Sequence, residues 1–179
     1  MRLFKSIFLL VGALLLVLFS GGNISAVSPS PSPAAEVNSF ELFWPLAPGK
    51  VMGDALYPIK SLKESVRGMF IFGVPQRVDY EVLLATKRVV EAEKLLKDGK
   101  SDAALKTLDI FLGKLDLSLS KWDEAKVAGN TPVSIKDNIR RQLNNLEVFL
   151  KFLASKNKDE VKVKVDQGLD KVMKLQNSL

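Results

Sequence analysis

The sequence of 179 residues contains no cysteine and no histidine. The absence of cysteine excludes disulfide bonds, lipid attachment at a lipobox cysteine and thiol nucleophiles. The absence of histidine excludes an imidazole base. Because both histidine and cysteine are absent, the usual protein ligands of zinc, copper and haem are absent too. Carboxylates, lysine, serine, threonine and tyrosine remain for catalysis, but no motif brings them together. We therefore expect a protein that is not an enzyme and that uses no metal or other cofactor.

Motifs of common active sites are also missing. The sequence has no Gly-rich phosphate loop, no G-x-S-x-G elbow and no Asp-rich calcium loop. Glu91 and Glu93 are two residues apart on a predicted helix, so their side chains diverge and do not form an acid/base pair. A hydrolase with a carboxylate site is a minor alternative, which a pocket with convergent Asp or Glu would favour.

Residues 1–26 have the organisation of a secretion signal. Two basic residues precede an apolar run over residues 7–19, and Ser25-Ala26 fits a cleavage site. The alternative is an uncleaved anchor, because the uncharged stretch 6–27 is long enough to span a bilayer. We favour cleavage because the strictly apolar part is short. In both cases we expect the rest of the chain outside the cytoplasm, whether secreted, periplasmic or anchored and facing outward.

The next segment, residues 27–37, is a linker rich in serine and proline. Alternating Ser and Pro favours an extended, solvated spacer, so we expect it to be disordered. The folded domain should therefore span residues 38–179.

An unusual cluster of large apolar side chains opens this domain. Its members are Phe40, Leu42, Phe43, Trp44 and Leu46. The prolines that interrupt it preclude a long helix, which predicts an extended aromatic arm. We expect the arm to lie along the helices and to bury Trp44, because large apolar side chains are usually inside. The alternative is a docking segment for another protein or for the membrane interface, which would use Phe40, Phe43 and Trp44.

Apolar residues at helical spacing predict about five helices after the arm. The expected starting points are Pro58, Gln76, Ser101 and Ser134, followed by a last helix after the polar joint 155–158. The stripe of the first helix consists of Ile59, Leu62, Val66, Met69 and Phe70. Each stripe needs a partner, and short joints make sequential helices antiparallel, so an all-α antiparallel bundle follows. Gly168 should weaken the last helix by up to about 1 kcal/mol relative to Ala.

Several charged residues lie on or beside the first two stripes. They are Lys60, Glu64, Arg88, Glu91 and Glu93. Solvated helix faces are the simpler interpretation, because surface ion pairs contribute little. The alternative is a cross-helix pair in which Lys60 or Glu64 meets Arg88 or Glu91. Lys60 precedes Glu64 by four residues, which is the weaker orientation for a pair within one helix.

The same region carries a family resemblance. Its most specific part is a Tyr-Pro-x-Lys-x-x-x-Glu box formed by Tyr57, Pro58, Lys60 and Glu64. Together with KRVVEAEKLL at 87–96, the box resembles a family of exported bacterial helical proteins known only as a domain of unknown function. The resemblance covers about residues 40–119. It implies an extracytoplasmic helical module with no assigned enzyme activity.

Basic residues are concentrated near the C-terminus. Residues 134–179 carry ten basic and six acidic residues, whereas residues 36–133 carry 14 of each. Candidate contacts to an anionic surface are Lys136, Arg140, Lys158 and Lys162. Nucleic acid is a poor partner for this modest excess, because the basic segment lacks interleaved aromatics. An anionic polymer or lipid head group fits better, and a merely solubilising surface fits better still.

These observations predict a non-enzymatic protein of the cell envelope that binds another macromolecule. A protein partner is expected first, and an anionic polymer or lipid head group second. The alternative is a periplasmic or extracellular protein with a chaperone-like or structural role. A contiguous apolar concavity would favour the chaperone, whereas a closed core with one small patch would favour a dedicated partner.

The cleaved signal yields the first prediction, that the mature chain begins at Val27. The apolar run is too short to favour an anchor, so signal peptidase should remove the first 26 residues. Intact-mass measurement of protein from the native host tests this. A membrane-bound species that retains Met1 would contradict it.

Overall fold

The computed structural model describes residues 37–129 and 131–179. In this part the chain forms helices and no strand, which confirms the all-α class. The helices are α2 (Ser39–Leu42), α3 (Tyr57–Met69), α4 (Val74–Lys97), α5 (Ser101–Ala128), α6 (Val133–Lys156) and α7 (Asp159–Ser178). The expected signal and nearly all of the expected linker lie outside the described residues. Within the described ranges, no helix has both the length and the apolar character needed to cross a membrane.

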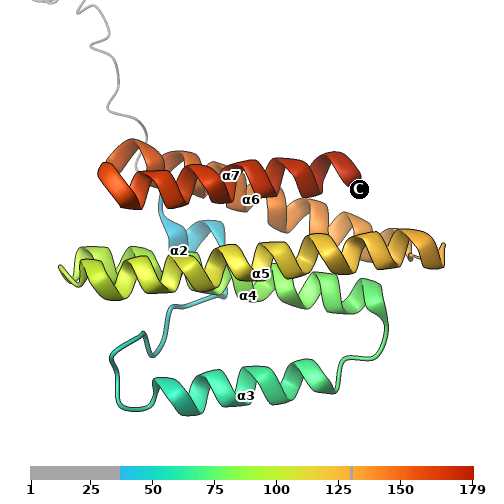
Figure 1. The fold of residues 1–179 in the computed structure, drawn as a ribbon, viewed down its shortest axis with the longest axis horizontal. Coiled ribbons are helices and arrows are strands. Elements are labelled where there is room, and N and C mark those ends of the chain that lie inside the picture. Colours follow the sequence, from blue (N-terminus) through green and yellow to red (C-terminus); the bar gives the residue numbers. More distant parts are fainter. Residues whose placement is uncertain (1–36, 130) are drawn as a thin grey trace, which may run out of the picture. The chain divides into compact units, whose positions relative to one another are not determined.

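Four long helices form the bundle. α4 packs against α5 and α6, and α7 packs against the same two helices, which closes a ring of four (Figure 1). The apolar stripes of these helices meet inside the ring. The largest buried side chains there are Phe111, Trp122 and Phe149. The apolar stripes predicted for α4 to α7 therefore pack together in one core.

Glycine closes the tight joint between α4 and α5. Gly99 has φ +72°, and its N–H donates to the carbonyl of Leu96 at 3.1 Å. The next N–H, of Lys100, donates to the carbonyl of Leu95 at 2.8 Å. This is a Schellman motif, which satisfies the last carbonyls of the helix and turns the chain back.

The first predicted helix departs from the expected bundle. α3 lies outside the ring, next to α4 (Figure 1). Its apolar stripe faces away from the core, and Met69 and Phe70 are 70% and 71% exposed. The expectation that all five helices pack through their apolar stripes is therefore wrong for α3. The physical reason is that the opposite side of α3 carries charged residues that find partners on α4.

The aromatic arm also differs from expectation. Its residues 39–42 form the one-turn helix α2, so the arm is not extended throughout. Phe43 packs edge-on against Phe149 of α6, with ring centroids 5.3 Å apart. Trp44, however, is 69% exposed and packs edge-on against Phe40 at 4.8 Å. The expected burial of Trp44 is wrong, because the arm turns Phe43, and not Trp44, towards the core.

The different burial of Phe43 and Trp44 predicts that their substitution by alanine lowers the free energy of unfolding by different amounts. Phe43→Ala should lower the free energy of unfolding by about 2 kcal/mol, because a half-buried Phe loses part of the 3 to 5 kcal/mol typical of a core site. Trp44→Ala should change it by less than about 0.5 kcal/mol, as expected for an exposed side chain. Urea unfolding of both variants measures this. Equal losses, or a larger loss at Trp44, would contradict the structure.

Gly168 has a packing role that the sequence did not indicate. It is buried in α7, and a Cβ atom added there would lie 2.3 Å from the Phe111 ring of α5. The glycine therefore permits close approach of the two helices. Its lower helix propensity is offset by the space that it leaves for Phe111.

Alanine scanning of two glycines tests this role. Gly168→Ala should destabilise by about 1 to 3 kcal/mol, because overpacking outweighs the gain in helix propensity. Gly113→Ala in α5 is the matched control, since an added Cβ there has no neighbour within 4 Å. The control should stabilise the protein by up to about 1 kcal/mol. Chemical unfolding that shows the same stabilisation for both variants would rule out the packing role.

Candidate functional site

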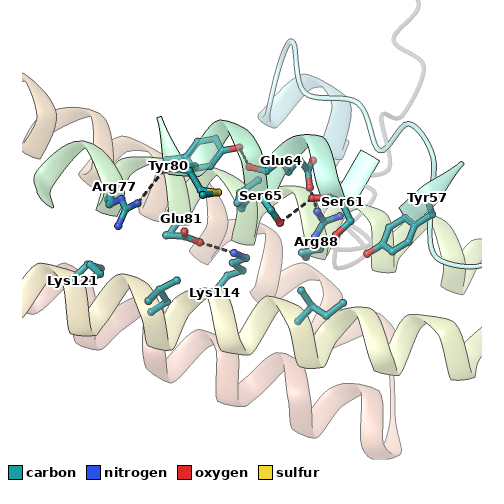
Figure 2. A pocket seen from close by; sticks show the side chains of 15 residues that line it. Tyr57, Ser61, Glu64, Ser65, Arg77, Tyr80, Glu81, Arg88, Lys114 and Lys121 are labelled. Atoms are coloured by element: carbon teal, nitrogen blue, oxygen red, sulfur yellow. Dashed lines mark hydrogen bonds and ion pairs between the residues drawn. The ribbon is translucent and has the colours of Figure 1, made fainter. Parts of the chain in front are cut away.

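A network of charged side chains joins α3 to α4. Glu64 of α3 points at Arg88 of α4 and pairs with it (Figure 2). The second oxygen of Glu64 accepts from Lys87 at 2.9 Å. Arg88 also pairs with Glu91, one turn further along α4. Lys60 of α3 pairs with the other oxygen of Glu91.

We call Lys60, Glu64, Lys87, Arg88 and Glu91 the ion cluster. Opposite charges alternate through it, so each carboxylate is shared by two cations. Arg88 and Glu64 are buried and Glu91 is 0% exposed. The predicted cross-helix pairs are therefore confirmed. The simpler interpretation, solvated helix faces, is wrong for these residues because α3 covers them.

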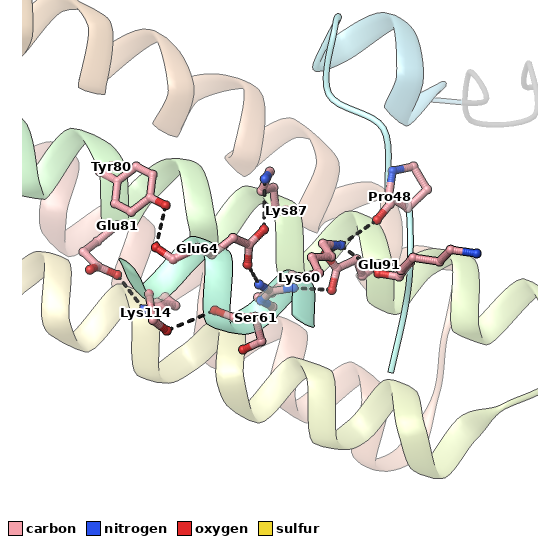
Figure 3. A network of polar contacts seen from close by, with 12 residues as sticks. Pro48, Lys60, Ser61, Glu64, Tyr80, Glu81, Lys87, Glu91 and Lys114 are labelled. Carbon is pink, nitrogen blue, oxygen red and sulfur yellow. Dashed lines mark hydrogen bonds and ion pairs between the residues drawn. The ribbon is translucent and has the colours of Figure 1, made fainter. Parts of the chain in front are cut away.

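Lys60 extends the ion cluster to the arm. Its ammonium group donates to the carbonyls of Pro48 at 2.8 Å and Lys50 at 2.7 Å, as well as to Glu91 (Figure 3). Lysine has three donors, and here each has an acceptor. One side chain thus fixes the end of the arm, α3 and α4 relative to one another.

Two more polar contacts hold α3 along its length. The Tyr80 hydroxyl donates to the backbone carbonyl of Glu64 at 2.9 Å. Near the end of α3, Arg77 donates to the carbonyl of Gly68 at 3.3 Å. Gly68 lies close to the Tyr80 ring, since a Cβ there would be 3.3 Å away. The inner side of α3 is therefore attached by polar and ionic contacts, and not by an apolar seam.

The electrostatics of the ion cluster keep the Arg88 guanidinium charged. Burial acts to lower the pKa of the Arg88 guanidinium, but the carboxylates of Glu91 and Glu64 outweigh it and the pKa is raised. The Tyr57 ring lies 5.7 Å from that guanidinium, and burial raises the pKa of its hydroxyl. Burial likewise raises the pKa of Tyr80. These shifts hold Arg88 charged and both tyrosines protonated near neutral pH, which suits an attachment site.

A cavity of about 330 Å³ lies beside the ion cluster, lined by α3, α4 and α5 (Figure 2). Two of its lining residues, Glu64 and Glu81, carry carboxylates. Glu64 is paired with Arg88, and Glu81 is paired with Lys114 of α5 at 2.8 Å. Each of these two carboxylates therefore lies beside a cation. The described residues also contain no cluster of His, Cys, Asp or Glu arranged to hold a metal ion.

The outer side of α3 was not anticipated as a surface. Its apolar stripe, Ile59, Leu62, Val66, Met69 and Phe70, is exposed along its whole length, as is Phe72 after the helix. We call these six residues the outer apolar face. The sequence did contain a signal for this orientation, because Tyr57, Lys60 and Glu64 recur at helical spacing on the opposite side. A helix with a charged side and an apolar side can pack on the bundle through either of them.

The predicted aromatic docking residues do not act as one unit. Phe40 and Trp44 are exposed and contact each other, whereas Phe43 packs on Phe149 in the core. A docking surface on the arm would therefore use Phe40 and Trp44 without Phe43.

The predicted basic surface near the C-terminus is largely occupied by local partners. Lys136 lies over the Trp122 ring, with its ammonium 5.7 Å from the ring centroid. Arg140 pairs with Asp137 at 3.3 Å, and Lys162 pairs with Asp166 at 2.5 Å. Lys158 is the exposed N-cap residue of α7, and its side chain makes no cap hydrogen bond, so local partners are found for three of the four predicted cations. These contacts weaken the case for a continuous cationic patch.

Comparison with known proteins shows to which family the chain belongs. The domain described as "Domain of unknown function (DUF5667)" matches residues 49–165, which is more than half of the chain. The chain belongs to the DUF5667 family. No curated protein and no solved structure matches it. The expected relation to a domain of unknown function is confirmed, while export and the Tyr-Pro-x-Lys-x-x-x-Glu box as a family motif stay predictions.

The extent of the DUF5667 match separates the two candidate surfaces. It includes α3 and α4, and with them the ion cluster and the outer apolar face. Phe40 and Trp44 precede it. The attachment of α3 thus lies within the segment that matches the DUF5667 domain, and Phe40 and Trp44 lie before that segment.

Substitution of Glu64 tests the ion cluster. Glu64→Ala should lower the free energy that holds α3 on α4 by about 3 to 5 kcal/mol, because it leaves the buried Arg88 with half of its partners. Because α3 lies outside the ring of four, we expect α3 to detach before the bundle unfolds. Native-state hydrogen exchange of the α3 amides measures this loss directly.

The matched control for this prediction is Glu124→Ala. Glu124 forms an exposed pair with Lys121 at 2.8 Å on α5, so its loss should cost less than about 1 kcal/mol. Unchanged protection of α3 in Glu64→Ala would show that the ion cluster does not hold the helix.

Proposed function

We propose that this DUF5667 protein is a non-enzymatic, exported module of the cell envelope that binds another macromolecule through the outer apolar face of α3. Export is supported by the signal-like organisation of residues 1–26. The absence of cysteine and histidine supports a binding role over catalysis.

The observation that carries the proposal is the orientation of α3. An isolated amphipathic helix next to an apolar core would bury its apolar side, since each large side chain gains about 1.5 to 3 kcal/mol on burial. Here the ion cluster and the Tyr80 hydrogen bond hold the polar side inward. The apolar side is left as a row of neighbouring exposed residues. Contiguous apolar surface of this kind is typical of interaction sites.

The shape of this surface favours a dedicated partner. The ring of four helices closes its own core, so the buried apolar residues there are not available to clients. The outer apolar face lies on a single convex helix. An unfolded client would be held better by a concave apolar surface, and α3 does not present one.

One feature favours the chaperone-like alternative. A cavity of about 320 Å³ lies under the arm, and its lining includes Leu42, Phe43, Trp44 and Leu83. It is small compared with what an unfolded segment requires, so we rank this alternative second.

A photo-crosslinking experiment tests the proposed function. A benzophenone amino acid replaces Leu62 in the full-length protein in its native host, and Val163 on α7 is replaced in the control. Both positions are exposed, at 65% and 54%. The proposal predicts a discrete adduct, of protein or lipid, from position 62 and none from position 163. The same adducts from both positions, or none from either, would contradict it.

A further inference from the structure

We infer that the outer apolar face of α3 binds an anionic lipid membrane, with α3 lying in the interface as an amphipathic helix. This inference rests on the proposed function and names the macromolecular surface that it involves. It depends on the described residues of α3 and its flanks alone.

The charge of the exposed part of α3 is of one sign. Its exposed residues are Pro58, Ile59, Leu62, Lys63, Ser65, Val66, Arg67 and Met69. None of them is acidic, and both charged ones are basic. The one acidic residue of α3, Glu64, is turned inward and paired with Arg88 and Lys87. The ion cluster thus removes from the surface the only α3 charge that would repel an anionic membrane.

The two exposed cations are placed beside the apolar stripe. Lys63 and Arg67 are four residues apart, so they lie one above the other on the helix. At 3.6 residues per turn they follow one edge of the outer apolar face. Neither forms a salt bridge with any residue that the structure describes. Arg67 lies over the Tyr80 ring of α4, with its guanidinium carbon 5.7 Å from the ring centroid, and both cations are exposed. An external anion can therefore reach them.

A membrane interface matches both parts of this surface at once. An interfacial helix buries its apolar side about 5 to 10 Å into the boundary of head groups and acyl chains, which is comparable to the diameter of a helix. Lysine and arginine at the edge of the stripe reach head-group phosphates while their methylene stems cover apolar surface. Phe70 and Phe72 extend the apolar side past the end of α3, where they are 71% and 83% exposed.

The position of α3 makes such contact possible. It lies at the outside of the bundle, with α4 on one side and no described helix on the other (Figure 1). The C-terminal helices are less suited to the same task, because Arg140 and Lys162 are already paired with acidic neighbours.

The absence of cysteine allows a direct test in the full-length protein. Leu62→Cys carries an environment-sensitive fluorophore on α3, and Val163→Cys carries it on α7. Each is mixed with phosphatidylglycerol vesicles, with phosphatidylcholine vesicles, or with none. We expect the fluorescence emission of the label at position 62 to shift to the blue with the anionic vesicles and to be quenched by brominated lipid. The label at position 163 should show neither effect. Residues 1–36 are the same in both labelled proteins.

Charge variants then test the role of the two cations. Lys63→Gln/Arg67→Gln should weaken partition to anionic vesicles about twenty-five-fold, since each basic residue near such a surface contributes about fivefold. The matched control, Lys106→Gln/Lys174→Gln, removes the same charge from exposed positions on α5 and α7 and should have little effect. Raising the ionic strength should also weaken binding of the parent protein to anionic vesicles, because salt screens the attraction between charges.

Each contrary outcome has a distinct meaning. No spectral change at position 62 with anionic vesicles would overturn the inference, as would an equal change with phosphatidylcholine. A blue shift without vesicles that grows with protein concentration would assign the face to a second copy of the chain. A protein adduct from position 62 in the native host, combined with no response to vesicles, would overturn the membrane inference and leave the proposed function standing.

Discussion

The shared burial of Glu64, Arg88 and Glu91 is the interaction on which the rest of this structure depends. Charges leave water at a high cost, which is offset only when each one meets opposite charge and hydrogen-bond partners. In the ion cluster every carboxylate faces two cations. Removing one member therefore leaves another buried and incompletely paired. This requirement fixes how α3 is rotated on the bundle, because only one side of α3 carries the needed charges.

The rotation of α3 determines which surface the protein presents. With Lys60 and Glu64 turned inward, the apolar stripe on the opposite side has no neighbour among the described helices. Lys60 also holds the carbonyls of Pro48 and Lys50, so the arm and α3 are attached at the same point. The result is a helical bundle that displays one amphipathic helix with its apolar side out. The proposed binding role rests on this geometry.

Much of the architecture was predictable from hydrophobic periodicity. The stripes of α4 to α7 and the glycine that ends α4 gave the correct elements, because the apolar residues of these helices recur at helical spacing. The pairing of Lys60 and Glu64 with α4 was the alternative to solvated helix faces, and it was suggested by a spacing within α3 that is unfavourable for a local pair. Periodicity identifies a face, however, and not its partner. For α3, which has both an apolar and a charged face, it could not say which one packs.

The remaining differences have the same origin in three-dimensional packing. Whether Phe43 or Trp44 enters the core depends on how the arm turns across α6, which neighbouring aromatic residues in a sequence do not reveal. The space that Gly168 leaves for Phe111 depends on two helices that are distant in the sequence. Propensity alone describes Gly168 as a weakness, whereas in the fold it is required for contact.

The orientation of α3 is the central claim, and thiol reactivity measures it most directly because the native chain has no competing cysteine. Single cysteines would replace Ile59, Leu62, Val66 and Ser61, and their rates of reaction with a maleimide would be compared in the folded protein. The structure predicts fast reaction at the three apolar positions, close to the rate of an unfolded control, and clearly slower reaction at Ser61, which faces the bundle. Slow reaction at Ile59, Leu62 and Val66 with fast reaction at Ser61 would show that α3 packs by its apolar side and would contradict the account.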